Sequence, residues 1–178
     1  MNTSYTVEIS KGTFALNREE YEDLGVSICL PEILESFSEE QIREKFVLAQ
    51  NPTGLKVNTE HKIMFTINST PMEIPGISPS DDSVNVLILE QQKVISRLTP
   101  GYQEYGVKSK LIDGHMVACL NYKSQSLEDD MYNIFYVFLH RGKMINGMFS
   151  CPLADQVEWN LVFLMCLDTL QFAPDKVG

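Results

Sequence analysis

Apolar and polar residues alternate with a two-residue period over most of the second half of the chain. This period is typical of β-strands whose two faces meet different surroundings. It predicts four strands, at Tyr102–Ile112, His115–Ser126, Met131–His140 and Lys143–Ser150. Asp113-Gly114 and Arg141-Gly142 then link neighbouring strands as two-residue hairpin turns. Because such short links join antiparallel neighbours, the four strands are predicted to form one antiparallel meander.

The third of these strands is apolar on both faces. Phe135 and Val137 belong to one alternating set, and Ile134 and Phe138 belong to the other. A strand of this kind is buried on both sides, so it needs packed layers above and below its sheet. We therefore expect helices on both faces of the meander.

The rest of the pattern supplies further strands and three helices. Short strands are predicted at Tyr5–Ile9, Thr13–Leu16, Val26–Leu30 and Lys62–Ser69. Helices are predicted at Ser38–Phe46, Ser83–Leu98 and Val157–Leu170. The second helix carries an apolar stripe that contains Val84, Leu87, Gln91, Val94, Ile95 and Leu98. These elements predict a single α+β domain over residues 1–178, whose central antiparallel sheet has about six or seven strands with helices on both faces.

The segment GMFSCPLADQVEW, from Gly147 to Trp159, connects the last strand of the meander to the final helix. Pro152 lacks an N–H group and is expected to end the strand pairing. Asp155 and Glu158 have the spacing of a capping box, so we expect them to satisfy free N–H groups at the helix start. Trp159 is expected to be at least half buried. We interpret these residues as a structural latch, in which the helix side pressed onto the sheet contains Val157, Leu161 and Leu164.

Cys151 lies in the same segment and has two interpretations. A thiol just before a helix start can have a lowered pKa and act as a nucleophile or a redox sensor. Such a nucleophile needs a base within reach, and His140 is expected to lie a whole strand length away. The second interpretation is a structural thiol that behaves as a small hydrophobic side chain, which the apolar surroundings favour.

The composition narrows the class of partner. The chain has 178 residues, of which 44% are hydrophobic and 21% are charged, and its net charge is −10. Such an acidic chain is poorly suited to nucleic acid or to an anionic membrane. We expect another protein as the partner, and a basic one fits the charge best, while a homo-oligomer stays open. No closely spaced cysteine pair and no secretory signal is found, so we expect a reduced, cytoplasmic protein.

Motifs that carry catalysis or cofactors are missing from the sequence. It contains no nucleotide-binding glycine loop, no Walker-type lysine loop and no serine-hydrolase elbow. Its histidines and cysteines lack the close spacing of zinc ligands. The acidic runs Asp81-Asp82 and Glu128–Asp130 are interpreted as solvated charges rather than cation ligands. We therefore predict no catalytic residue, no metal site and no cofactor.

One loop is unusual because it keeps large apolar residues among prolines. It runs from Thr70 to Ser80 and contains Met72, Ile74 and Ile77. These side chains either fold back on the core or contact a partner, since exposed apolar loops are costly in a monomer. Both alternatives stay open from the sequence.

The order of these elements resembles the PsbP/Mog-like superfamily, and more closely its bacterial branch of small PsbP-like proteins related to DcrB. The residues that carry the resemblance are VSICLPEILE, KIMFTINST, SVNVLILEQQKVISRLTPGY, LIDGHMVACLNYKS, YNIFYVFLHRGKMINGMFSCP and EWNLVFLMCLDTLQF. They span residues 26–172, with strands of the first 25 residues preceding them. Ser150 stands where the branch more usually has asparagine before its Cys-Pro step.

The resemblance implies an α/β/α sandwich with a central antiparallel sheet. It also implies accessory proteins with no established enzymatic activity, such as photosystem assembly factors, a Ran-binding protein and bacterial chaperones that load effectors onto secretion machinery. The plant metal-binding residues match no positions in this chain. We therefore expect a non-catalytic protein-binding module of the chaperone or adaptor type. The alternatives are a thiol-dependent enzyme or redox sensor centred on Cys151, and a small-ligand binding protein with a pocket between sheet and helix.

Overall fold

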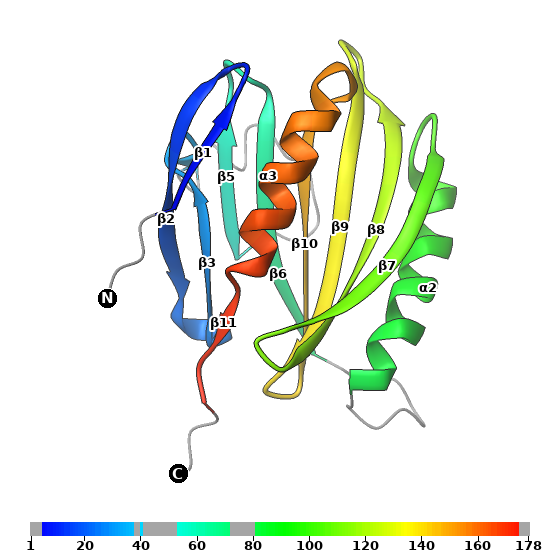
Figure 1. Cartoon of the computed structure of the whole chain (residues 1–178). Helices are drawn as coiled ribbons and strands as arrows, with labels where there is room; N and C mark the ends of the chain where they lie inside the picture. Colours follow the sequence, from blue (N-terminus) through cyan, green and yellow to red (C-terminus); the bar gives the residue numbers. More distant parts are fainter. Residues whose placement is uncertain (1–4, 38–39, 41–52, 72–80, 175–178) are drawn as a thin grey trace.

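Two antiparallel sheets and two α-helices form the part of the chain that the structure describes (Figure 1). The computed structural model describes residues 5–37, 40, 53–71 and 81–174. The helix expected at Ser38–Phe46 lies almost wholly outside these residues. The α+β class predicted from the sequence pattern is confirmed.

The larger sheet contains seven strands, which pair in the order β4-β5-β6-β10-β9-β8-β7. Their bounds are β4 (Glu35–Ser36), β5 (Gly54–Asn58), β6 (Ile63–Pro71), β7 (Gln103–Ile112), β8 (His115–Gln125), β9 (Asp130–His140) and β10 (Lys143–Pro152). The smaller sheet has the order β1-β2-β3-β11. Its strands are β1 (Tyr5–Ile9), β2 (Gly12–Tyr21), β3 (Val26–Pro31) and β11 (Gln171–Phe172). The helices are α2 (Asp81–Leu98) and α3 (Gln156–Asp168), and the short 3-10 turns are η1 (Glu22–Leu24) and η2 (Leu153–Asp155).

The predicted meander is confirmed as β7-β8-β9-β10, with every pairing antiparallel. Asp113 and Gly114 have φ values of 48° and 80°, and Arg141 and Gly142 have 53° and 71°. Two consecutive positive φ angles are the signature of the type I′ turn, whose twist matches that of the flanking strands. The backbone angles therefore confirm both predicted hairpin turns.

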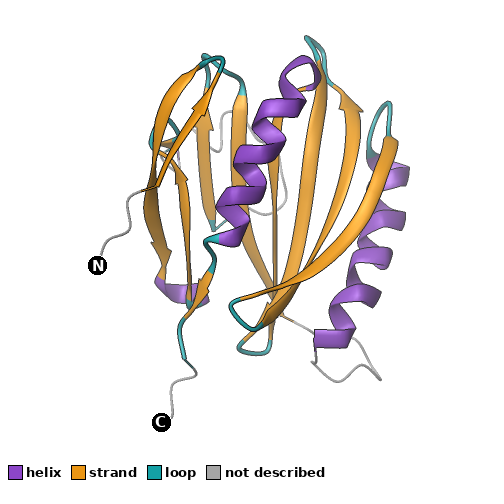
Figure 2. Cartoon of the chain, viewed as in Figure 1, coloured by secondary structure: helices purple, strands orange, loops and turns teal. Residues whose placement is uncertain are grey.

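Layers cover both faces of the larger sheet, as the doubly apolar strand predicted (Figures 1 and 2). Helix α2 packs against β8 and β9 on one face, whereas α3 and the smaller sheet lie on the other. Strand β9 contributes to a separate apolar core on each side. Tyr136 and Phe138 join the core beneath α3, and Val137 and Leu139 join the core beneath α2.

The smaller sheet adds a feature that the sequence pattern did not predict. The N-terminal strands were expected, but their pairing with the short strand after α3 was not. Gln171 and Phe172 pair with Ser27 and Val26 of β3, and Arg18 Nη1 donates to the Thr169 carbonyl at 3.1 Å. A two-residue strand has no periodicity to detect, so only the folded chain reveals this pairing.

The inward side of α3 differs from the prediction. Val157 and Leu161 are 74% and 60% exposed, and Leu164 is only partly buried. The residues that face the core are Trp159, Val162, Phe163, Cys166 and Leu167. Because α3 is apolar almost all round, its period does not identify the inward side. Burying Trp159 and Phe163 removes more apolar area from water than burying valine and leucine, so the aromatic side packs inward.

The stripe of α2 is buried only in its first half. Val84, Leu87 and Ile88 are enclosed against the sheet, whereas Val94 and Leu98 are 48% and 76% exposed. Its main contacts in the described part of the chain are with β8, β9 and β7. Val94 and Leu98 therefore belong to the predicted apolar stripe but lie outside the buried core.

Trp159 provides a test of the packing beneath α3. Its side chain is 0% exposed and stacks on Phe14 and Phe163, with ring centroids 5.8 and 6.1 Å away. Trp159→Ala should lower the free energy of unfolding by about 3–5 kcal/mol, because it leaves a large cavity. Urea unfolding followed by circular dichroism measures this change. Val157→Ala, on the exposed side of the same helix, is the matched control and should cost less than about 0.5 kcal/mol.

Candidate functional site

Cys151 lies inside the core rather than in a reactive position. It pairs with Tyr132 near the end of β10, and its side chain is 0% exposed. Burial, and secondarily the charge of Asp155, raises the pKa of the Cys151 thiol to about 12. His140 pairs with Lys143 at the opposite end of the same hairpin. A neutral, enclosed thiol with His140 at the far end of the hairpin lacks the features of an activated nucleophile.

Burial also affects the pKa of two of the other cysteines. All four are free, and burial raises the pKa of Cys119 to about 12 and that of Cys166 still further. Among the described residues, no group of histidine, cysteine, aspartate and glutamate side chains could hold a metal ion. No helix in the described ranges is long and apolar enough to cross a membrane.

The latch residues connect α3 to the smaller sheet in a different way from the one predicted. Asp155 makes no side-chain cap hydrogen bond, and instead pairs with Lys11 at 3.4 Å. Glu158 accepts hydrogen bonds from the backbone N–H of Ser10 at 2.8 Å and from its hydroxyl at 2.5 Å. These bonds hold the pKa of Glu158 below its usual range. The capping prediction for Asp155 and Glu158 is therefore wrong, because the turn between β1 and β2 offers closer partners.

Pro152 and Trp159 occupy the positions that the sequence suggested. Pro152 is the last residue of β10, and η2 follows it directly before α3 begins. Trp159 is fully enclosed. The candidate contact residues Met72, Ile74 and Ile77 lie outside the described residues.

A region of the larger sheet beside α3 carries partly exposed polar residues, and we call it the shelf. Helix α3 packs on β3 and β10, so β8 and β7 extend to one side of it (Figure 1). On β8, alternation from the buried Val117 places Cys119, Asn121 and Lys123 on the α3 side of the sheet. On β7, Lys108 and Lys110 lie opposite Cys119 and Val117, so they point to the same side.

Basic side chains are concentrated on the shelf of this otherwise acidic chain. Lys110 pairs with Asp168 at the end of α3, and Lys123 pairs with Asp130 at 3.2 Å. Lys108 is exposed, and no ion pair of Lys108 occurs within the described residues. The shelf therefore has a local positive charge that its two carboxylates only partly neutralise.

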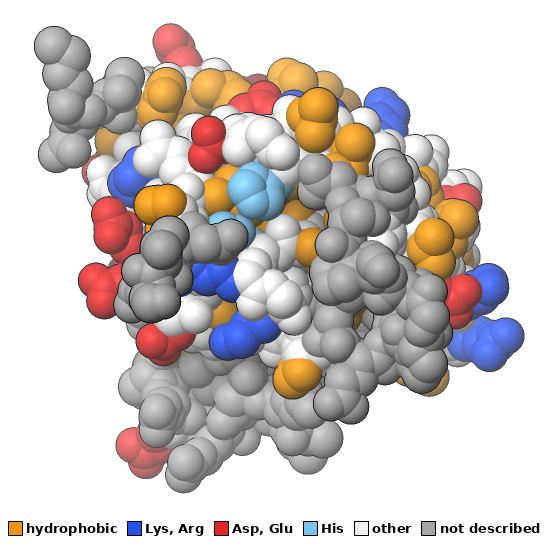
Figure 3. Space-filling view, turned by 90° about the horizontal axis from the view of Figure 1, so that it is seen from below, with side chains coloured by type: hydrophobic (Ala, Val, Ile, Leu, Met, Phe, Trp, Pro, Cys, Tyr) orange, Lys and Arg blue, Asp and Glu red, His pale blue; other side chains and the backbone are white. Residues whose placement is uncertain are grey.

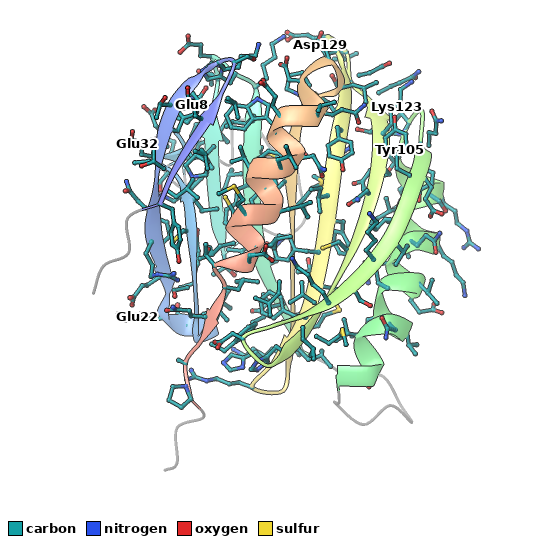
Figure 4. All side chains as sticks on the ribbon, viewed as in Figure 1. Glu8, Glu22, Glu32, Tyr105, Lys123 and Asp129 are labelled. Carbon is teal, nitrogen blue, oxygen red and sulfur yellow. The ribbon has the colours of Figure 1, made fainter. Side chains whose placement is uncertain are left out.

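Aromatic and amide groups line the upper part of the shelf. Figure 4 shows Tyr105 and Lys123 close together near the upper ends of β7 and β8. The ring of Tyr105 stacks on Tyr132 with centroids 6.0 Å apart, and the Tyr132 hydroxyl donates to Asn160 Oδ1 of α3 at 2.8 Å. Asn121 Oδ1 is buried and accepts no hydrogen bond from the described residues. Polar and aromatic side chains of the shelf thus connect β7 to α3 by way of Tyr132.

A second candidate site is a methionine-lined groove on the α2 side of the larger sheet. Its volume is about 440 Å³, and its lining includes Met64, Met131, Met148, Asn133 and Ser150, with Lys62 at the edge. Ser150 Oγ donates to Asn133 Oδ1 at 2.7 Å, and Asn133 Nδ2 donates to Ser124 Oγ at 2.9 Å. The buried polar groups therefore satisfy one another, which leaves the thioether side chains as the main contact surface.

A third hollow, of about 420 Å³, lies at the lower end of the molecule. Glu20, Glu22, Arg141 and Phe172 are among its lining residues. Arg141 Nη2 donates to the Pro174 carbonyl at 2.8 Å, and Phe172 stacks on His115 with ring centroids 3.7 Å apart. Figure 3 shows the histidine side chains near the middle of this end, beside apolar side chains. These contacts fix β11 and Pro174 to the meander, so we assign them a structural role.

The shelf was not predicted from the sequence. Lys108, Ser109 and Lys110 stand in a strand that was correctly predicted, and their alternation already places both lysines on one face. What the pattern does not indicate is that β7 is an edge strand and that α3 leaves this part of the sheet uncovered.

Comparison with known proteins identifies similar folds. No protein-family model and no curated protein sequence matches the chain. The solved structure of PsbP (CyanoP) from Synechocystis sp. PCC 6803 has a TM-score of 0.63 at 11% identity, and covers 88% of this chain and 92% of that one. LpqN of Mycobacterium tuberculosis, which is involved in cell envelope biogenesis, has a TM-score of 0.58 at 10% identity, with coverage of 90% and 92%. PA94 of Pseudomonas aeruginosa, a protein of unknown function, has a TM-score of 0.55 at 13% identity, and the match covers 89% of this chain and 98% of that one.

At these identities the likeness shows the fold alone. The chain has a PsbP-like fold, as the order of its elements suggested. The activity of the chain has to be argued from its own surface.

The environment of the cysteines leads to a test of the thiol interpretation. Iodoacetamide at about pH 8 should leave Cys151 unmodified in the folded protein, because a buried thiol with a raised pKa supplies almost no thiolate. In concentrated urea all four cysteines should react. Mass spectrometry of the alkylated peptides measures both states. Rapid native modification of Cys151 would contradict the structural assignment and favour a redox role.

Proposed function

We propose that the chain is a non-catalytic protein-binding module of the chaperone or adaptor type. The observation that carries this proposal is the exposed apolar side of α3 next to the shelf. Val157, Leu161 and Met165 follow one another at four-residue spacing and are all exposed. A continuous apolar strip on a packed helix is typical of a surface that another protein covers.

The surroundings of this strip resemble the rim of a protein interface. Tyr105 and Tyr132 supply aromatic area, whereas Lys108 and Lys123 supply charge at the periphery. Interfaces generally combine an apolar and aromatic centre with a polar rim. The enclosed thiols and the lack of a metal cluster in the described part of the chain give no comparable support to catalysis.

A second candidate function is the binding of a small apolar ligand in the methionine-lined groove. The specific observation is the pairing of apolar walls with a polar floor whose groups bond to one another. Methionine side chains adapt their shape to different apolar ligands. Lys62 at the edge could attract a carboxylate, although Asp129 already pairs with it at 2.5 Å.

The protein-binding proposal can be tested with a change on α3. Leu161→Asp should reduce the recovery of specific partners at least about tenfold, because it places a charge in the apolar strip. The melting temperature should stay nearly unchanged, since Leu161 is 60% exposed. The measurement is affinity capture from the cells that produce the protein, followed by quantitative mass spectrometry.

Leu98→Asp is the matched control for that capture, because Leu98 is also exposed but lies at the end of α2. It should retain the proteins that the wild type retains. If Leu161→Asp recovers the same proteins at the same levels, the α3 strip is not the binding surface.

The ligand-binding alternative predicts a different response. Titration with decanoate should shift the methyl resonances of Met64, Met131 and Met148 in a saturable way, because these side chains line the groove. Met148→Trp should fill the groove and remove the response. The matched control is Met165→Trp on the exposed side of α3. A titration without shifts at these three methionines would exclude this function for medium-chain fatty acids.

A further inference from the structure

Strand β7 is an edge strand with an unpaired outer side. It is ten residues long and pairs only with β8, and no strand lies beyond it among the described residues. Alternate N–H and C=O groups of such a strand point away from the sheet and can bond to another strand. The other edge strands offer fewer backbone groups for pairing, since β1 has five residues and β4 and β11 have two each.

The side of β7 that faces the shelf is basic. Lys108 and Lys110 are both exposed and project on this side. Asp168 of α3 already pairs with Lys110, which shows that a carboxylate can reach this position. Glu104, the acid within β7, accepts hydrogen bonds from Tyr102 and Gln92 and is therefore engaged elsewhere.

The opposite side of β7 is apolar. Val107 and Leu111 lie opposite Leu120 and Met116 of β8, and they are 37% and 64% exposed. Gln92 of α2 bonds to Glu104 of β7, so this side of α2 faces the strand. Leu89 lies one turn earlier on that side and is half-exposed. An added strand would therefore cover apolar surface on one face of the sheet and meet lysines on the other.

We propose that β7 accepts an extended segment of a partner protein as an eighth strand of the larger sheet. The segment carries acidic side chains on one face, opposite Lys108 and Lys110, and apolar side chains on the other, opposite Val107 and Leu111. Main-chain hydrogen bonds supply the affinity and the alternating side chains supply the selectivity. This inference rests on the proposed protein-binding function and names the chemistry of the partner.

A second copy of this chain fits the edge poorly. An antiparallel twofold pairing of two β7 strands about Ser109 sets Lys108 of each copy against Lys110 of the other. Like charges directly opposite each other destabilise a strand pair. The bulge between Glu104 and Gly106 also breaks the regular register at the start of β7. Both features disfavour pairing between two copies. The segment Val107–Ile112 keeps a regular register, so it can still pair with an acidic strand.

The experiment uses fluorescein-labelled octapeptides with alternating side chains and the full-length protein. The peptide TEVEVEVT should bind, with affinity that decreases as salt rises, whereas TKVKVKVT should not. The double variant Lys108→Glu/Lys110→Glu should weaken binding of TEVEVEVT at least about tenfold. The control variant Lys93→Glu/Arg97→Glu, which makes the same charge change on exposed positions of α2, should bind as the wild type does.

Two further measurements identify strand pairing. Hydrogen exchange should slow at amides of β7 when TEVEVEVT is bound, and N-methylation of alternate residues along one edge of the peptide should abolish binding. Equal binding by the Lys108→Glu/Lys110→Glu variant, protection outside β7, or no binding at all overturns the proposal. The peptide measurements test β7, whereas the affinity capture with Leu161→Asp tests the α3 strip, so failure of the strand proposal is distinguishable from failure of the α3 surface.

Discussion

Burial of β9 on both faces is the constraint on which the other layers depend. One alternating set of its side chains needs α3 and the smaller sheet, and the other set needs α2. At its centre, the Tyr136 hydroxyl crosses β10 and donates to the Thr66 carbonyl of β6 at 2.7 Å. This crossing requires Gly147, because a Cβ there would lie 1.9 Å from the Thr66 oxygen and 2.3 Å from the Tyr136 hydroxyl. Tyr136, Gly147 and Thr66 thereby fix β9, β10 and β6 to one another.

The two helices cover only part of a seven-stranded sheet. Helix α2 lies over β8 and β9, and α3 lies over β10, so each face keeps a region that neither helix covers. On the α3 side this region is the shelf, and on the α2 side it contains the methionine-lined groove. The candidate binding surfaces are therefore consequences of where the helices pack. The packing beneath α3 and the smaller sheet also buries Cys29, Cys151 and Cys166.

Local patterns determined much of the fold. The two hairpin turns, the alternation of the meander and the doubly apolar β9 are properties of neighbouring residues, so the sequence by itself specifies them. The burial of Trp159 follows from its size in an apolar segment. In the candidate site, the lysines of β7 could be placed on one strand face, but their exposure could not be inferred.

Only the tertiary structure decided the features that depend on distant residues. Because α3 is apolar almost all round, competition between its aromatic and aliphatic sides for the core decided that Val157 and Leu161 face outward. Glu158 meets Ser10, which lies 148 residues earlier, and so bonds to the β1–β2 turn rather than capping α3. The position of β7 at the sheet edge is likewise set by the pairing order of all seven strands. Sequence periodicity determines which residues share a face, whereas the packing of distant elements determines which faces remain open to a partner.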